Sequence, residues 1–165
     1  MLKGKAHKFG DSISTDHIIP GRYAHLRSNL PELAKHVLED ADVNFAKKVK
    51  PGDFVVGGKN FGQGSSREHA PTIIKMAGIG AVLAKSFARI FYRNAINIGL
   101  PVVICDTDQI DEGDDLEVDL SKGTITDLTK GVTQRFPSLP PVMQRIFDEG
   151  GIVAYIRNHG DLEAV

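Results

Sequence analysis

The chain has 165 residues, of which 41% are hydrophobic and 25% are charged, proportions typical of a globular protein with one domain. Lys and Arg number 20 and Asp and Glu number 21, so the formal net charge is -1. This balance argues against a nucleic-acid partner bound through a basic tail and against a membrane partner bound through a charged surface. The apolar runs are far shorter than the roughly 18 residues of a membrane span. The N-terminus lacks an apolar core, so we expect a cytoplasmic protein.

The first two thirds of the chain alternate between predicted strands and helices. The helices are predicted from apolar residues spaced about 3.6 residues apart, and the strands are predicted from short apolar runs between turn residues. In chain order, the predicted elements are a strand at 3–9, a long loop at 11–29, a helix at 31–38, a strand at 54–57, a helix at about 67–77, a strand at 81–84, a helix at 86–98 and a strand at 102–105.

The C-terminal third is predicted to add antiparallel pieces. These are a hairpin of strands at 116–120 and 123–128, an irregular segment at 131–141, a helix at 142–149 and a last strand at 152–156. Because strands and helices alternate before this region, we predict a single α/β domain over residues 1–165 with a mixed sheet.

A glycine-rich loop, GGKNFGQGSSREHA at 57–70, lies between a predicted strand and a predicted helix. This order suits anion binding, because the N–H groups and the dipole at a helix N-terminus favour negative charge. Gly62 and Gly64 allow positive φ and close backbone approach. Arg67 adds a full charge and a two-pronged carboxylate contact. Since the positive charge of an arginine at a helix N-terminus destabilises the helix, we expect a bound anion to compensate for this charge.

Helix capping is an alternative, purely structural explanation for some residues of this loop. Ser65 and Glu68 have the spacing of a capping box, in which each side chain caps a free backbone N–H group. Capping alone does not explain the glycines, Ser66 and Arg67 together. The loop lacks the Gly-Lys-Ser/Thr of a phosphate loop and the third glycine of a dinucleotide fingerprint. The sequence therefore predicts an anion site of another kind.

A second polar cluster lies at 11–27, DSISTDHIIPGRYAHLR. Arg22 and Arg27 would suit a substrate with several carboxylates if this segment meets the glycine-rich loop. His17 and His25 fit either a site or a solvated surface position, and the sequence leaves open whether the two segments meet.

The single cysteine, Cys105, lies in the apolar run PVVICD. Alone it cannot form an intrachain disulfide, hold an iron–sulfur cluster or build a structural zinc site. Its surroundings favour packing in the core over a redox role.

Three segments together resemble the aconitase family, in particular its separate small subunit. They are STDHIIPGRY at 14–23, GGKNFGQGSSREHAP at 57–71 and AKSFARIFYRNAINIGLP at 84–101. The resemblance extends from about Lys3 to Tyr155. It implies a swivelling β/β/α domain with a mixed sheet flanked by helices, which closes over the active site of a hydro-lyase.

The resemblance also implies roles for individual residues. Ser65 matches the general base that removes a carbon-bound proton, and Ser66 and Arg67 match residues that bind a substrate carboxylate. Arg27 is a further candidate for substrate binding. The residues expected to support the loop are Gly62, Gly64, Asp16 and His17. A serine base needs strong stabilisation of its alkoxide, which an arginine, backbone amides and a helix N-terminus can supply.

Members of this family remove water from a 2-hydroxy acid and add it back in the opposite orientation, so that the hydroxyl group moves to the neighbouring carbon. The first expectation is the interconversion of 2- and 3-isopropylmalate in leucine biosynthesis. The alternative is a homoaconitase-like or dimethylmalate-type hydro-lyase. Arg27 supports this alternative, because related enzymes for tricarboxylates tend to carry an arginine in this loop.

The resemblance implies that the chain itself holds no metal. A [4Fe–4S] cluster is expected in a large catalytic subunit, with which this chain would form a heterodimer or heterotetramer. A different class, a lone ligand-binding or regulatory domain, is a third hypothesis. Binding of RNA by such a domain would call for a basic excess that this chain lacks.

Overall fold

The computed structural model describes residues 1–64 and 68–160, and its centre is a mixed sheet of seven strands in the order β4-β3-β2-β1-β5-β6-β7. The strands are β1 (Leu2–Lys8), β2 (Phe54–Val56), β3 (Ala81–Ala84), β4 (Val102–Ile104), β5 (Asp115–Asp119), β6 (Thr124–Asp127) and β7 (Val132–Arg135). The helices, including the 3₁₀ turns η1 and η2, are α1 (Thr15–Ile18), η1 (Gly21–Leu26), α2 (Leu30–Ala34), α3 (Phe45–Lys48), α4 (His69–Met76), α5 (Arg89–Asn97), η2 (Thr107–Gln109), α6 (Pro141–Asp148) and α7 (Ile152–His159). None of the helices in these described ranges is long and apolar enough to cross a membrane.

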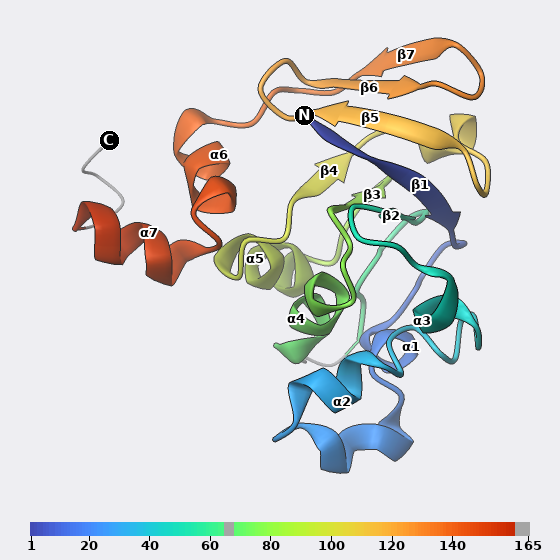
Figure 1. The fold of residues 1–165 in the computed structure, drawn as a ribbon, viewed down its shortest axis with the longest axis vertical. Helices are drawn as coiled ribbons and strands as arrows, with labels where there is room; N and C mark the ends of the chain where they lie inside the picture. Colours follow the sequence, from blue (N-terminus) through green and yellow to red (C-terminus); the bar gives the residue numbers. More distant parts are fainter. Residues whose placement is uncertain (65–67, 161–165) are drawn as a thin grey trace.

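Strand β1 belongs to both halves of the sheet. Its first part, from Leu2 to Lys5, pairs antiparallel with β5, and its last part, from Ala6 to Lys8, pairs parallel with β2. Gly4 lies in the first part, where a Cβ atom would overlap the carbonyl of Gly52. One strand thus passes between the two halves, and the antiparallel strands lie above the parallel ones (Figure 1).

Two apolar clusters cover the two faces of the parallel strands, whose successive side chains point to opposite sides. Val55, Val82 and Val102 pack with side chains of α1, α2, α4 and α5. Phe54 and Val103 pack on the other face with side chains of β5 and β6. The layers are therefore helices, parallel strands and antiparallel strands. The predicted α/β class with β/β/α layering and a mixed sheet is confirmed.

Most predicted elements are present. Strand β3 spans its predicted residues, and the predicted hairpin is the antiparallel pair of β5 and β6. Helix α4 begins at His69 rather than at 67, and α5 begins at Arg89 rather than at 86. Gly78 has a φ of 102° just after α4, so the predicted glycine stop of this helix is confirmed.

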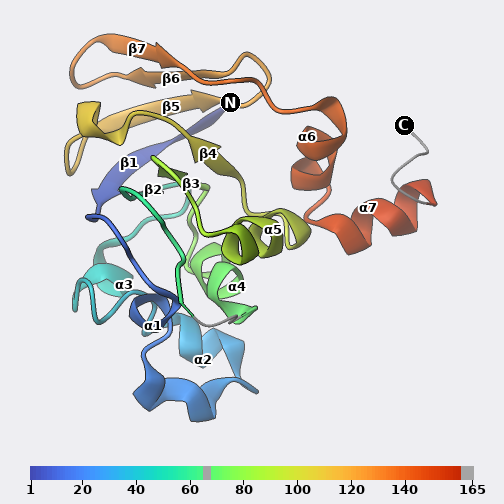
Figure 2. The same ribbon diagram turned by 180° about the vertical axis from the view of Figure 1, so that it is seen from behind.

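The segment 152–156 is not the predicted strand but the start of α7. Its apolar run, IVAYI, fits either structure by composition. In the helix, Tyr155 is buried while Val153 and Ile156 remain 66% and 41% exposed. Contacts with α5 and α6 select the helix. Figure 2 shows α6 and α7 beside α5, away from the antiparallel strands.

The predicted loop at 11–29 and the predicted irregular segment at 131–141 contain regular structure instead. The loop holds α1 and η1, and the later segment holds β7, whose polar residues join the sheet through backbone pairing with β6. Helix α3 was not predicted. Helix α2 ends at Ala34, before the predicted end at Leu38, and Leu38 has a φ of 56° that no α-helix allows.

A buried hydrogen bond between two side chains joins β1 to the turn before β2. His7 Nε2 lies 2.7 Å from Asp53 Oδ2, and the amides of Lys5 and Lys50 donate to the same carboxylate at 3.0 and 2.9 Å. Burial by itself would raise the pKa of Asp53. The hydrogen bonds from His7 and from the two amides outweigh burial and hold this pKa below its ordinary value.

Replacing Asp53 with Ala tests this pair. The variant leaves buried donors without an acceptor, so we expect the free energy of unfolding to fall by about 3 kcal/mol at neutral pH. Because folding lowers the pKa of Asp53, its contribution is complete above a pH of about 4 and is lost as the pH falls through the lowered pKa. In urea titrations from neutral to acidic pH, the free energy of unfolding should therefore fall less in the variant than in the wild-type protein.

Asp115 supplies the matched control, because its ion pair with Lys5 is more than half exposed on both sides. Replacing Asp115 with Ala should change the free energy of unfolding by at most about 0.5 kcal/mol. Equal losses in the two variants would contradict the role given to Asp53.

Candidate functional site

The glycine-rich loop continues the sheet beyond the carboxyl end of β2. On one side it bonds to the segment after β1, through Gly58 N to Gly10 O (3.0 Å), Ser12 N to Lys59 O (2.7 Å), Gly62 N to Ile13 O (2.7 Å) and Thr15 N to Gln63 O (2.8 Å). On the other side it bonds to the segment after β3, through Lys85 N to Gly58 O (3.0 Å), Phe61 N to Ser86 O (3.0 Å) and Ala88 N to Phe61 O (2.9 Å). The two polar segments that the sequence left unplaced therefore meet, and the backbone between them is fixed on both edges.

Close packing explains the glycines of this loop. Gly62 has a φ of 87°, and a Cβ atom there would overlap the ring of Phe91. Gly64 has a φ of 107° and lies against Thr15, whose Oγ1 would be 3.2 Å from a Cβ atom. The predicted positive φ angles are confirmed. The part of these glycines in substrate binding stays a prediction.

Three side chains that the sequence analysis did not single out hold the loop in place. Asp11 Oδ1 accepts a hydrogen bond from Lys59 N at 2.8 Å, and Ser86 Oγ accepts one from Asn60 N at 2.8 Å. Thr107 Oγ1 donates to the carbonyl of Gly57 at 2.8 Å in a buried position. Asp11, Ser86 and Thr107 all follow a parallel strand shortly after its carboxyl end. This position after a strand could have identified the three residues from the sequence.

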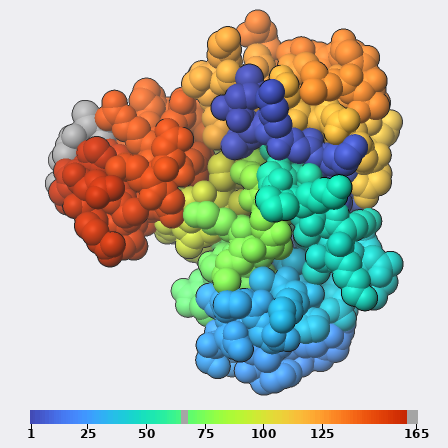
Figure 3. Space-filling model, viewed as in Figure 1, coloured from blue at the N-terminus to red at the C-terminus, as the bar shows by residue number. Residues whose placement is uncertain are grey.

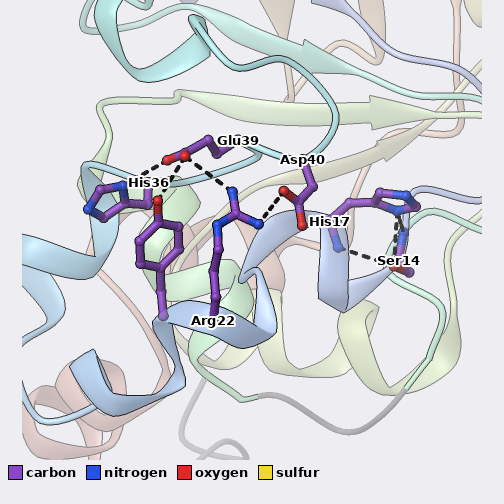
Figure 4. Close-up of polar contacts among 7 residues, drawn as sticks. Ser14, His17, Arg22, His36, Glu39 and Asp40 are labelled. Atoms are coloured by element: carbon purple, nitrogen blue, oxygen red, sulfur yellow. Dashed lines mark hydrogen bonds and ion pairs between the residues drawn. The ribbon is translucent and has the colours of Figure 1, made fainter.

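A capping box that the sequence analysis did not predict forms at α1. Ser14 Oγ accepts a hydrogen bond from His17 N at 3.2 Å, and Ser14 N donates to His17 Nδ1 at 2.9 Å. His17 thus stabilises the turn at Ser14 (Figure 4), and its predicted support of the glycine-rich loop stays a prediction. Asp16 is exposed in the first turn of α1, and its part in the site stays a prediction.

Glu68 is the N-cap of α4, which begins at His69, and its side chain makes no capping hydrogen bond to this helix. The predicted capping box pairs Glu68 with Ser65, which lies outside the described residues, so the box stays a prediction. The candidate base Ser65 and the candidate carboxylate ligands Ser66 and Arg67 lie outside the described residues. Their roles stay predictions.

Arg22, one of the two arginines in the second polar cluster, is bound by acidic residues of this chain (Figure 4). Its guanidinium lies 2.6 Å from Asp40 Oδ1 and 3.2 Å from Glu39 Oε1. The bond to Asp40 raises the pKa of Arg22. Glu39 also accepts a hydrogen bond from Tyr23 at 2.8 Å and lies 2.7 Å from His36, which lowers the pKa of Glu39. The charge of Arg22 is therefore neutralised locally.

Arg27 is exposed at the end of η1, and its Nε donates to the carbonyl of Ala24 at 3.0 Å. His25 is also exposed, in η1. Neither residue lines the cavity described next. A role of Arg27 in substrate binding stays a prediction.

A cavity of about 310 Å³ opens between the loop and the first turn of α5. Its lining combines glycine backbone, polar groups and apolar side chains: Thr15, Gly62, Gly64, Ala88, Arg89, Ile90, Phe91 and Asn94. The size suits a small molecule. The cation of Arg89 and the helix N-terminus favour an anionic ligand. In the chain, Ser65 directly follows Gly64 of this lining.

Cys105 is partly buried beside the second apolar cluster. Burial, together with the nearby charge of Asp106, raises the pKa of its thiol to about 12, so the reactive thiolate is not populated at neutral pH. This agrees with the predicted packing role. In the described part of the chain, no group of three or more His, Cys, Asp or Glu side chains is arranged to hold a metal ion.

Comparison with known proteins places these features in a family. The model of the aconitase C-terminal domain matches residues 17–106. The chain is 67% identical to the 3-isopropylmalate dehydratase small subunit 2 of Archaeoglobus fulgidus over 98% of both chains. It is 59% identical to small subunit 1 of the same enzyme from Thermotoga maritima over the full length of both chains. A crystal structure of 3-isopropylmalate dehydratase from Methanocaldococcus jannaschii shares the fold with a TM-score of 0.90 and 51% identity, covering 96% of this chain and 95% of that one.

Replacing Gly62 with Ala tests the packing of the loop. The methyl group would overlap Phe91, and alanine disfavours the positive φ of this position. We therefore expect the free energy of unfolding to fall by about 2–4 kcal/mol. Gly10 is the control, because a Cβ atom there meets nothing within 4 Å. Chemical denaturation of both variants measures the difference, and equal stability of the two would contradict the packing argument.

Proposed function

Because this chain belongs to the family of the aconitase C-terminal domain, we propose that it is the small subunit of a 3-isopropylmalate dehydratase. The observation that carries this proposal is the end-to-end match, at 67% identity, to a protein of that name. The solved relative, which shares the fold at 51% identity, supports the same assignment. The chemistry is then a hydro-lyase reaction in leucine biosynthesis, in which water is removed from 2-isopropylmalate and added back to give 3-isopropylmalate.

In the proposed mechanism Ser65 is the general base. It takes the proton from the carbon next to the one that carries the hydroxyl group. That hydroxyl group leaves as water after it gains a proton, and a double bond forms between the two carbons. Water then adds to this bond in the opposite orientation, and a proton returns to the carbon that first carried the hydroxyl group. The hydroxyl group thereby moves to the neighbouring carbon. Ser65 follows a loop that is bonded on both edges and precedes the N-terminus of α4, where a negative charge is favoured. A serine alkoxide needs such a setting.

Ser66 and Arg67 are proposed to bind a substrate carboxylate. Both follow Ser65 in the chain, so the loop would deliver the base and the carboxylate contacts together. An arginine suits this task because its planar guanidinium can donate two parallel hydrogen bonds to one carboxylate.

The iron–sulfur cluster of the family does not fit this chain. Such clusters are held mainly by several cysteine thiolates, and the sequence has one cysteine, whose thiol is protonated and partly buried. We place the cluster in a large catalytic subunit, with which this chain forms a heterodimer or heterotetramer. A cytoplasmic location stays a prediction.

Reconstitution with the cluster-bearing large subunit of the same organism tests the substrate. The pair should interconvert 2- and 3-isopropylmalate, and turnover of homoaconitate, citrate and dimethylmalate should be slower by at least about tenfold in kcat/KM. Activity confined to the tricarboxylates would refute the proposed substrate and favour the homoaconitase-like alternative that Arg27 raised.

Replacing Ser65 with Ala in the reconstituted enzyme tests the base. We expect kcat to fall by about 10²–10⁴-fold, because the proton would have no positioned acceptor. KM should change little. Ser138, an exposed serine between β7 and α6, provides the control, and its replacement with Ala should leave kcat unchanged. Wild-type turnover in the Ser65 variant would rule out the assignment.

A further inference from the structure

Positive charge is concentrated in the middle of the chain. Residues 69–105 contain no Asp or Glu, but they carry four cations, namely Lys75, Lys85, Arg89 and Arg93. The whole chain has a formal net charge of -1, so this segment differs in sign from the rest.

Two of these four cations are satisfied within the chain. Lys75 Nζ donates to a backbone carbonyl at 2.8 Å, and Lys85 Nζ lies 2.6 Å from Asp108 Oδ2. Among the residues that the structure describes, no acidic group lies within ion-pair distance of Arg89 or Arg93. Both arginines are exposed on α5.

The two arginines lie on one side of α5. They are four residues apart, and Phe91 and Ala95, which are buried, occupy the opposite side. Ile90 adjoins them and is 49% exposed. We call Arg89, Ile90 and Arg93 the outer face of α5. Like charges at this spacing destabilise a helix, and a cation in the first turn opposes the helix dipole. In the isolated chain this arrangement is unfavourable, and the attraction of an anionic neighbour would offset both effects.

The outer face of α5 begins at the mouth of the cavity. Arg89 and Ile90 line the cavity together with Gly62 and Gly64, whereas Arg93 does not. A small molecule held in the cavity therefore leaves the charge of Arg93 without a partner. Helix α5 itself lies between two lobes, one formed by α6 and α7 and the other by the N-terminal helices (Figure 1 and Figure 3).

We propose that the outer face of α5 docks against an acidic surface of the large, cluster-bearing subunit. This inference rests on the proposed function, in which that subunit completes the active site and must cover the mouth of the cavity. Arginine is one of the residue types enriched among the residues that dominate binding energy at protein interfaces, and the buried core of an interface is more apolar than its rim. The paired arginines also supply long-range attraction, which speeds the approach of an oppositely charged partner.

Replacing Arg93 with Glu tests the surface, because Arg93 lies outside the cavity and Arg89 does not. The Kd between the purified chain and the cluster-bearing large subunit is measured by titration calorimetry. We expect the Kd to rise at least about tenfold in the variant. Raising KCl from about 50 to about 250 mM should weaken the wild-type complex more than the variant complex. Arg135 on β7, also exposed, is the control, and its replacement with Glu should leave the Kd within about twofold of wild type.

A wild-type Kd in the Arg93 variant overturns the docking surface, as does an equal loss in the Arg135 control. If circular dichroism shows that the Glu variant is misfolded, Arg93→Gln removes the charge with a good helix former and gives the same comparison. Failure of the wild-type chain to bind the large subunit at all would refute the proposed function and this surface together. Binding without turnover of isopropylmalate would refute only the substrate.

Discussion

Backbone hydrogen bonds on both edges of the segment from Gly57 to Gly64 are the constraint on which the candidate site depends. They join the chain beyond the carboxyl ends of three parallel strands into one rigid unit. Because the neighbouring segments come so close, side chains have no room at Gly62 and little at Gly64. The loop can therefore present the residues that follow Gly64 from a fixed point.

The curled sheet decides where this fixed point lies. Strand β1 pairs with β5 over its first half and with β2 over its second half, so the antiparallel strands cover one face of the parallel strands. The helices cover the other face, and the cavity lies beside the loop that follows the carboxyl end of β2. Asp11, Ser86 and Thr107 follow strands at this edge and hold the loop, which is the position at which open α/β sheets bind ligands.

Electrostatics divides the cations of the chain into two groups. Arg22 is neutralised by Glu39 and Asp40, so its role is local and structural. Arg89 lines the cavity, and Arg93 continues the same positive surface outside it. The sequence has one cysteine, and two exposed arginines lie on the helix beside the cavity. This agrees with its assignment as one subunit of a two-subunit enzyme.

The sequence by itself determined the α/β class, most strands and helices, the positive φ of Gly62 and Gly64, and the family, because periodicity, glycine positions and motifs are local properties. Tertiary structure alone decided that 152–156 is helical, that β7 joins the sheet and that Ser14 and His17 form a capping box at α1. It also decided that the segments at 11–27 and 57–70 meet. These outcomes depend on contacts between residues distant in the chain, which select among local structures of similar energy and leave no trace in the local pattern.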